Sequence, residues 1–457
     1  MNSRIKKILI LSVGPVPTAV TSKVEGGGLR AWGLAQGLNK NGISVTVAMP
    51  DNFDLEISQT NDGISLRKWS FNNLNELFVG HDAVYVLYSR GDLMKFVAEN
   101  LPKEKLLIVD LYVPIYIESL ARELKRTPEE LSQYLFDLKH WNTAFPRGDF
   151  FICANETQYH FYNGVLSALG RINPVTYNHN ILDILPYGIH SKELIHNKSV
   201  CKNVLIKDTD FMILWFGGLY PWFDIKPLLL SVKDLSIKNS DVKLVILGGR
   251  NPFVTDKKFM QQYDFALDFA KKEDLFEKNI FFIDWIAYEE RNNWYMESDL
   301  VVNLHHKSKE TIYSWRTRII DYIWGELPIL TTGGDEASEY LAKKDCAIIL
   351  KSNTVEDISA KIGTLYENRD VLKRMKHNIA NIKPDFYWEN ITKNLAAFIK
   401  KGAISPDRDM LDKQKLHLKK IKRKDESIPY LISLSVKILF KRGPKEFLRK
   451  IHGYILK

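Results

Sequence analysis

Two arginines that could bind phosphate lie within residues 305–335, HHKSKETIYSWRTRIIDYIWGELPILTTGGD. Arg316 and Arg318 fall in the first turn of a predicted helix, with Ser314 as its N-cap because a serine hydroxyl can accept from the free amides of a first turn. The N-terminus of a helix attracts anions, so two cations there require a negative partner. We expect a diphosphate, since helix N-termini bind phosphate and arginine binds it through paired hydrogen bonds.

Two carboxylates complete this stretch. Glu310 lies in a predicted loop before the helix, and Asp321 lies further along the helix itself. A carboxylate accepts hydrogen bonds from pairs of hydroxyl groups, which a sugar or a ribose supplies and an apolar core does not. The stretch therefore predicts a ligand that carries both phosphate and sugar. The alternative for Glu310 is a solvated loop acid beside Lys307 and Lys309.

The elements that must position these residues alternate between apolar runs and helical patterns. Continuous apolar runs are typical of parallel strands that are covered on both faces. Because strand, helix and strand repeat through both halves of the chain, we predict two Rossmann-like α/β domains that face each other. The predicted strands cover residues 8–13, 44–50, 82–88, 106–111, 149–154, 211–218, 242–249, 279–285 and 299–306. The predicted organisation is a first domain in residues 1–190, a second domain in 205–385, a helix crossing back to the first domain in 386–402 and a basic amphipathic tail in 403–457.

Further candidates in the first half lie where strands end and helices begin. Gly27 and Gly28 belong to a glycine cluster after the first strand, which lacks the compact G-x-G-x-x-G spacing of a dinucleotide-binding fingerprint. Asp110 ends a predicted strand, and Glu156 precedes a predicted helix. Because ligands of open α/β sheets bind outside the carboxyl ends of the strands, we predict that these residues face the site. The alternatives are an ordinary flexible loop for the glycines and a capping role for Asp110.

The stretch around Arg316 resembles the signature region of the retaining glycosyltransferases of family 4. Its form, S-x-R-T-R-x-x-D-Y-x-W, is similar to the branch of that family that builds bacterial surface polysaccharides. The family's second acid binds the ribose of a nucleotide-sugar and stands six residues before a Leu-Pro pair, a place that Asp321 occupies ahead of Leu327. The family's first acid would fall at Tyr313, so either the loop is longer or the role has moved to Glu310. The resemblance implies the GT-B arrangement, with the nucleotide-sugar donor on the second domain and the acceptor on the first.

The resemblance also implies a role for each candidate. Arg316 and Arg318 would stabilise the departing diphosphate without a divalent metal or another cofactor, and Glu310 would orient the hydroxyls of the donor sugar. The expected donor-binding residues are Asp321, Ser314, His305, Arg250 and the glycine pairs Gly217, Gly218, Gly333 and Gly334, whose amides can hold phosphate. The expected residues on the acceptor side are Gly27, Gly28, Asp110 and Glu156.

The net charge of +9 is carried by the end of the chain. Residues 413–457 contain fourteen Lys or Arg and three acids, which leaves −2 for the other 412 residues. Basic segments that are interleaved with aliphatic and aromatic residues bind anionic bilayer surfaces, whereas nucleic acid needs the charges but not the aliphatic run. We therefore predict that the tail attaches to an anionic membrane and that nucleic acid is not a partner. The alternative is a solvated, partly helical extension.

The cysteines and the hydropathy pattern indicate the compartment. Cys153, Cys201 and Cys346 are far apart in sequence, which favours reduced, buried thiols in a cytosolic protein. No run approaches about twenty apolar residues, so no transmembrane helix is predicted. We expect a cytoplasmic protein that is peripheral to the inner face of the cell membrane.

The predicted activity is transfer of a sugar from a nucleotide diphospho-sugar to a hydroxyl of a glycan or lipid-linked acceptor, with retention of configuration. One alternative is a nucleotide-sugar epimerase of the same fold, which would need neither an acceptor nor a membrane tail. A second alternative is a non-catalytic scaffold that binds a partner enzyme. The missing acid at Tyr313 favours the scaffold, whereas retention of Asp321 and both arginines disfavours it.

Overall fold

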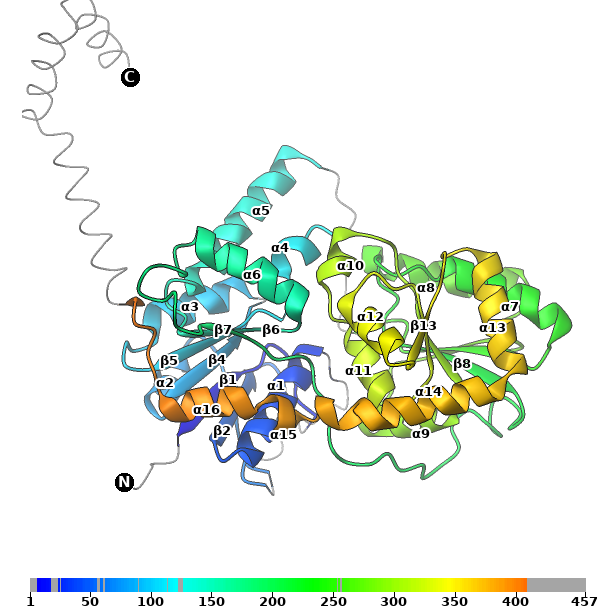
Figure 1. Ribbon diagram of the computed structural model, residues 1–457, viewed down its shortest axis with the longest axis horizontal. Coiled ribbons are helices and arrows are strands. Elements are labelled where there is room, and N and C mark those ends of the chain that lie inside the picture. The colour runs from blue at the N-terminus through cyan, green and yellow to red at the C-terminus, as the bar shows by residue number, and fades with distance from the viewer. Residues whose placement is uncertain are drawn as a thin grey trace, which may run out of the picture.

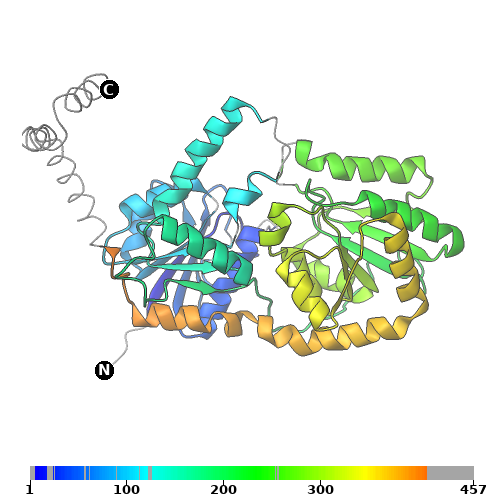
Figure 2. The ribbon, with the colours of Figure 1, turned by 45° about the horizontal axis from the view of Figure 1, so that its top comes forward.

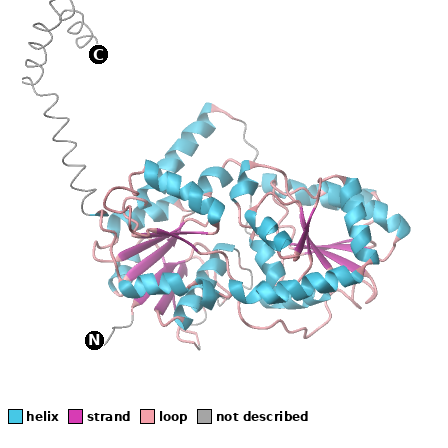
Figure 3. Ribbon diagram, viewed as in Figure 1, coloured by secondary structure: helices cyan, strands magenta, loops and turns pink. Residues whose placement is uncertain are grey.

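The computed structural model describes residues 6–17, 24, 26–55, 58–60, 62–88, 90–112, 114–121, 126–252, 254 and 257–408. Two α/β domains lie side by side, each built on its own parallel sheet (Figure 1). Helices lie on both sides of each sheet (Figure 3). The predicted pair of Rossmann-like domains is confirmed.

The first sheet has seven parallel strands in the order β3-β2-β1-β4-β5-β6-β7. Its strands are β1 (Lys7–Leu11), β2 (Ser44–Pro50), β3 (Ser65–Trp69), β4 (Ala83–Leu87), β5 (Leu106–Asp110), β6 (Phe150–Cys153) and β7 (Leu182–Ile184). Two of these were not predicted, because β3 reads SLRKW with two basic residues and β7 is only three residues long. The strand order reverses between β1 and β4, and ligands of such sheets bind at this switch point.

The helices of the first domain connect these strands. They are α1 (Gly26–Lys40), α2 (Leu74–Val79), α3 (Gly91–Asn100), α4 (Ile115–Glu118), α5 (Pro128–Trp141), the 3₁₀ turn η1 (Asn142–Ala144) and α6 (Glu156–Ala168). Helix α5 projects from the domain in both views (Figure 1, Figure 2). It begins with a capping box in which the Thr127 hydroxyl and the Glu130 carboxylate each accept from the other residue's amide, so its start is determined locally.

The second sheet has six parallel strands in the order β10-β9-β8-β11-β12-β13, with its switch point between β8 and β11. Its strands are β8 (Phe211–Phe216), β9 (Val242–Leu247), β10 (Ile280–Ile283), β11 (Leu300–Asn303), β12 (Ile329–Thr331) and β13 (Ala347–Ile349). The helices of this half are α7 (Lys226–Lys238), η2 (Lys257–Met260), α8 (Gln261–Lys272), η3 (Tyr288–Glu290), α9 (Arg291–Glu297), α10 (Lys309–Tyr313), α11 (Thr317–Trp324), α12 (Glu336–Lys343), α13 (Val355–Glu367), α14 (Arg369–Ile382) and η4 (Lys383–Phe386).

The last helices return to the first domain. Helices α15 (Trp388–Ile391) and α16 (Lys393–Lys401) pack against α1, and the chain from α14 to α16 runs along one side of both domains in Figure 1. A Cβ atom on Gly33 of α1 would lie 2.0 Å from the Trp388 indole. Glycine at that position therefore allows the two helices to approach closely.

Residues 403–408, which were predicted as the start of the tail, are anchored to the first domain. Arg171 and Asp407 form a buried ion pair of 3.0 Å, and the backbone N–H of Ser405 donates to Asp149 at 2.9 Å. Arg408 also forms an ion pair with Asp149. The membrane prediction for residues 413–457 lies outside the described residues. Within the described part of the chain, each helix is too short or too polar to cross a bilayer.

The three cysteines, Cys153, Cys201 and Cys346, are buried and free, as predicted. Burial raises the pKa of each thiol. They are therefore packing residues in this structure.

Candidate active site

Two adjoining cavities lie between the carboxyl ends of the two sheets. The larger compartment has a volume of about 320 Å³ and is lined by residues that follow β8, β9 and β10, together with α11 and the segment around Tyr187. The smaller compartment has a volume of about 250 Å³ and lies between α1, α4 and α10. Both compartments share Gly26, Tyr220, Thr317 and Arg318, so they form one continuous cleft between the domains.

The N-termini of two helices meet where the compartments join. Helix α1 begins at Gly26 and α11 begins at Thr317, and a Cβ atom on Gly26 would lie 3.8 Å from the Thr317 methyl group. The glycine cluster was predicted as a loop before the helix, but it forms the first turn of α1. This turn contains no acidic side chain that would neutralise the positive end of the helix dipole. Both helix ends present free amides and positive dipole ends to the same space, which suits a diphosphate.

Gly27 and Gly28 lie in this first turn of α1. Gly27 lines the smaller compartment. Gly28 faces the other way, because a Cβ atom there would lie only 1.9 Å from the carbonyl oxygen of Pro15. Gly28 thus lets the start of α1 pack against the loop after β1, which places Gly26 and Gly27 in the cleft.

The prediction that Ser314 caps the helix is wrong. The N-cap of α11 is Arg316, and Ser314 instead ends the separate short helix α10 by donating from its hydroxyl to the carbonyl of Thr311 at 3.1 Å. Ser308 is the N-cap of α10, because its hydroxyl accepts from the Thr311 amide. The sequence interpretation therefore overlooked an N-cap six residues before Ser314, and Glu310 lies within a helix instead of a loop.

Glu310 and Arg316 form a buried pair in the smaller compartment. The two guanidinium nitrogens of Arg316 donate to the two carboxylate oxygens of Glu310, each at 2.6 Å. Glu310 is 3% exposed, so the alternative of a solvated loop acid is wrong. The negative partner that Arg316 requires is thus supplied by the chain itself through a two-pronged contact.

Arg318 is buried without such a partner. One of its nitrogens donates to the carbonyl of Gly218 at 2.9 Å, and its Nη1 has no hydrogen-bond partner. Within the described residues, no carboxylate forms an ion pair with Arg318. Burial is the main reason why its pKa is lowered to about 10; Tyr322 opposes this decrease, and the charge of Arg316 adds to it. The guanidinium lies 3.8 Å from the ring centre of Phe223 and lines both compartments, where an anionic ligand would neutralise it.

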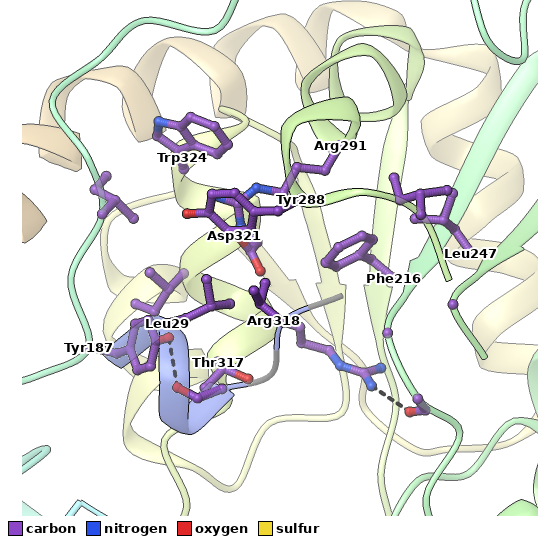
Figure 4. Close-up of a pocket in the computed structure, with 18 of the residues that line it drawn as sticks. Leu29, Tyr187, Phe216, Leu247, Tyr288, Arg291, Thr317, Arg318, Asp321 and Trp324 are labelled. Atoms are coloured by element: carbon purple, nitrogen blue, oxygen red, sulfur yellow. Dashed lines mark hydrogen bonds and ion pairs between the residues drawn. The ribbon is translucent and has the colours of Figure 1, made fainter. Parts of the chain in front are cut away.

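Asp321 lies in the larger compartment beside an arginine that sequence reasoning missed. Arg291 donates to Asp321 at 2.6 Å, and its guanidinium lies 3.8 Å from the ring centre of Tyr288 and 4.5 Å from that of Trp324. Figure 4 shows Asp321 and Arg291 near Tyr288, with Arg318 extending to the other side of the cleft. Burial raises the pKa of Asp321, and the charge of Arg291 opposes that increase. The Asp321 side chain is 20% exposed, so it can accept further hydrogen bonds from a ligand.

The larger compartment is also lined by several aromatic side chains. Such rings form flat surfaces for a planar ligand, and the few polar groups among them can orient it. The aromatic side chains in this lining come from both domains and are Tyr187, Phe216, Tyr220, Trp285, Tyr288, Trp324 and Trp388. They are scattered over 200 residues of sequence, which is why no local pattern identified them.

The structure places some of the predicted donor-binding glycines in the cleft and leaves the others, together with Arg250, outside it. Gly217 and Gly218 line the larger compartment, but the Gly217 amide donates to Leu247 at 2.9 Å and is not free for phosphate. Gly333 and Gly334 have φ angles of 71° and 86° in the turn after β12, outside the linings of both compartments. Arg250 is also outside them, since it is exposed and paired with Asp264.

His305 lies behind the cleft. Its Nε2 atom is 3.3 Å from the Asp335 carboxylate, and both side chains are fully buried. Burial raises the pKa of Asp335, but the neighbouring His305 and the hydrogen bonds from the Ser338 amide and hydroxyl outweigh burial and leave the pKa below its ordinary value. His305 therefore supports the N-cap of α12 and lines neither compartment.

Asp110 is buried in the interior of the first domain, where it contacts other residues of that domain. It pairs with buried Arg30, accepts from the Tyr85 hydroxyl and accepts from the Tyr112 amide at 3.0 Å. It lines neither compartment, so the alternative structural role fits its position.

Glu156 is exposed at the start of α6, also outside both linings. Its backbone N–H donates to Glu336 of the second domain at 3.1 Å, and the amide of Thr157 donates to the same carboxylate at 2.8 Å. Two further hydrogen bonds cross the cleft, from the Tyr112 hydroxyl to Trp315 at 2.6 Å and from Gln158 to Tyr313 at 2.7 Å. Glu156 therefore belongs to the contact between the domains.

Glu118 is a second residue that sequence reasoning missed. It ends α4 and lines the smaller compartment from the first domain, opposite Glu310 and Arg316. A helix of four residues gives no periodic pattern, so the sequence did not single it out. Among the described residues, no group of three or more His, Cys, Asp or Glu side chains is arranged to hold a metal ion.

Comparison with known proteins agrees with this geometry. The family model described as glycosyl transferases group 1 matches residues 199–382, which include β8 to β13 and both α10 and α11. No curated protein sequence matches the chain.

Solved structures with similar folds cover most of the chain. Sucrose-phosphate synthase from Thermosynechococcus elongatus superposes with a TM-score of 0.65 at 11% identity, covering 87% of this chain and 98% of that one. HepE from Anabaena, solved with UDP and glucose, gives a TM-score of 0.58 at 14% identity, covering 87% and 100%. A Listeria monocytogenes protein described as a UDP-N-acetylglucosamine 2-epimerase gives 0.51 at 14% identity, covering 87% and 96%. The match over residues 199–382 and the two facing sheets indicate a glycosyltransferase-type enzyme with the GT-B fold.

Proposed function

We propose that the enzyme moves a sugar from a nucleotide diphospho-sugar to a hydroxyl of a glycan or lipid-linked acceptor, with retention of configuration. The observation that carries this proposal is the buried Arg318 guanidinium, which has no carboxylate partner within the described residues and lies where two helix N-termini meet. A buried cation of this kind is costly unless an anion binds it. A diphosphate supplies that anion.

The two compartments suit the two ends of such a donor. The aromatic larger compartment would take the nucleoside, with Asp321 accepting from the ribose hydroxyls. The diphosphate would lie at Arg318 and the free amides of α1 and α11. The sugar would then extend into the smaller compartment, where Glu310 is held in place by Arg316 and can accept from hydroxyl groups.

The chemistry requires charge compensation as the bond between sugar and phosphate breaks. Arg318 and the two helix ends are already oriented towards the departing diphosphate, and preorganised groups of this kind stabilise developing charge more effectively than water does. We propose that this arrangement replaces a divalent metal. Turnover should then be unchanged by excess EDTA.

The biological setting is part of the same proposal. The resemblance of residues 314–324 to the surface-polysaccharide branch and the basic, aliphatic residues 413–457 support an acceptor held at the inner face of the bacterial membrane. A test is binding of the full chain to vesicles with and without anionic lipid, since electrostatic attachment requires the anionic lipid.

The epimerase alternative uses the same donor site, and its fold is shared by the Listeria protein. An epimerase changes the donor sugar without an acceptor, whereas a transferase releases the nucleoside diphosphate. The scaffold alternative is disfavoured because Arg318 and Asp321 line the cleft, and a scaffold without a ligand has no use for them. Release of nucleotide therefore separates the remaining two activities.

The experiment that tests the proposal uses the full chain. Thermal unfolding is measured with UDP, dTDP, GDP, ADP and CMP, because a ligand that binds only the folded state raises the midpoint. UDP is the first candidate, since HepE binds it. The chain is then incubated with the matching nucleotide-sugar, and the released nucleotide and the sugar product are analysed. Stabilisation with nucleotide release supports the transferase, stabilisation with an isomerised donor supports the epimerase, and no stabilisation by any nucleotide overturns the proposal.

A further inference from the structure

A carboxylate of the first domain lies across the smaller compartment from the Glu310–Arg316 pair. Glu118 ends α4, and α4 packs directly against α10, the helix that carries Glu310. Glu118 and Glu310 are the two acids in the lining of this compartment. Each comes from a different domain, so the compartment has one carboxylate on its donor side and one on its acceptor side.

Glu118 differs from Glu310 in having no partner among the residues that the structure describes. Arg316 holds both oxygens of Glu310, whereas within the described residues the Glu118 carboxylate forms neither a hydrogen bond nor an ion pair. A half-buried carboxylate without a partner carries a desolvation cost that a structural role would not explain. Its position in the cavity lining makes it available to a ligand.

The charges around Glu118 favour proton exchange near neutral pH. Burial and, to a smaller extent, the negative charge of Glu310 together raise the pKa of Glu118 to about 7, although the positive charge of Arg316 opposes both. The other titratable groups in the lining are Tyr112, Tyr220, Arg318 and Arg30, the last of which is paired with Asp110. Two nearby carboxylates with such different surroundings are the usual arrangement for an acid or base role.

We propose that Glu118 binds the acceptor hydroxyl and takes its proton. This inference rests on the proposed function, because it assigns the acceptor to the first-domain side of the donor sugar. The hydroxyl that attacks would donate a hydrogen bond to Glu118, which fixes its oxygen beside the sugar held by Glu310. The ligand class is therefore an alcohol, such as a sugar hydroxyl, presented between α4 and α10.

The step balances without any further reagent. The bond between the anomeric carbon and the phosphate oxygen breaks, and both of its electrons leave with the nucleoside diphosphate. The acceptor oxygen forms a new bond to the anomeric carbon on the same face from which the diphosphate departs, so that the configuration is retained. Its proton passes to the Glu118 carboxylate, which later releases the proton to solvent.

The test compares variants of the full chain in release of UDP from UDP-glucose, with water and with n-octyl glucoside as acceptors. Glu118→Gln keeps the size of the side chain and removes its basicity, so we expect release to fall by about 10²- to 10⁴-fold. Stabilisation by UDP should be unchanged, because Glu118 lies outside the larger compartment. The matched control is Glu129→Gln, an exposed acid on α5 that should leave both properties unchanged.

Two further measurements separate a proton acceptor from a structural residue. In the wild type, release should rise as pH increases through about 7, where Glu118 loses its proton, and Glu118→Gln should lack this rise. Formate should restore part of the activity of Glu118→Ala by occupying the vacated space as a carboxylate. If Glu118→Gln binds UDP and retains wild-type release and pH dependence, the role of Glu118 is overturned. If the wild type neither binds UDP nor releases it from UDP-glucose, the proposed function fails, and the role of Glu118 fails with it.

Discussion

Arg316 donates two hydrogen bonds of 2.6 Å to the carboxylate of Glu310, and both side chains are buried in the wall of the cleft. Two residues further on, Arg318 has one hydrogen bond, to a backbone carbonyl, and a free Nη1 atom. The two arginines of this motif thus have opposite roles. Arg316 is neutralised within the protein and positions an acid, whereas Arg318 keeps its charge for a ligand.

Replacing Arg318 by methionine should weaken UDP binding without lowering the thermal stability of the protein. The variant loses charge-assisted hydrogen bonds to the diphosphate, worth about 1.5–3 kcal/mol, so the affinity for UDP should fall by about 10- to 100-fold. The unfolding midpoint without ligand should not fall, because an unpaired buried charge is removed. Calorimetric titration and thermal unfolding measure the two effects. The control is Arg250→Met, which removes an exposed arginine outside the cleft and should leave UDP affinity unchanged.

The Glu310–Arg316 pair should show strong coupling in a double-mutant cycle. Glu310→Gln leaves Arg316 buried and unpaired, so we expect a loss of about 3–5 kcal/mol in the free energy of unfolding. Combining it with Arg316→Met should recover most of that loss. Urea unfolding of the four proteins measures the coupling. The exposed pair Asp370–Lys373 is the reference, and Asp370→Asn should have little effect on stability because solvent screens such a pair. Additive effects at Glu310 and Arg316 would contradict the pairing.

Gly28→Ala should displace the start of α1. The new Cβ atom would lie 1.9 Å from the Pro15 carbonyl, so α1 or the loop after β1 must move. We expect lower thermal stability and weaker UDP binding, because the free amides of Gly26 and Gly27 move with the helix. Gly164→Ala is the control, since a Cβ atom on this exposed glycine of α6 meets nothing within 4 Å. It should increase stability by about 0.5–1 kcal/mol because alanine favours helix. Unchanged UDP binding in Gly28→Ala would argue against the α1 amides as ligands.

The Asp335 carboxylate should make stability depend on pH in the acid range. Its folded pKa lies below the unfolded value of about 3.9, so its contribution is fully present above that value and is lost as pH falls through the folded pKa. Asp335→Asn retains an N-cap for α12 but cannot ionise. The difference in unfolding free energy between wild type and variant should therefore shrink as pH falls below about 4. A difference that stays constant between pH 3 and pH 7 would show that the charge of Asp335 is not stabilising.

Sequence alone was sufficient for the elements whose signals are local. The apolar runs at residues 44–50 and 106–111 are strands β2 and β5, and the predicted helix over Pro128–Trp141 is α5, because period and capping residues act within a few positions. The same local reasoning brought Arg318 and Asp321 into one site, since both lie on α11 and line the larger compartment. Repetition of the strand and helix pattern was enough for the fold class.

Only the tertiary structure decided how the charges pair and which ones stay free. Glu310 is bound to Arg316 instead of being solvated, and Asp110 faces Arg30 instead of a ligand. Both outcomes depend on burial and on partners up to 80 residues away in sequence. Glu118 and Arg291 enter the cleft only because α4 packs against α10 and because α9 lies beside α11. Pairing energies of buried charges depend on distance and desolvation in three dimensions, which a linear pattern does not contain. The sequence by itself therefore determined the two domains and the position of the phosphate-binding motif, and the packing of one domain against the other determined the chemistry of the site.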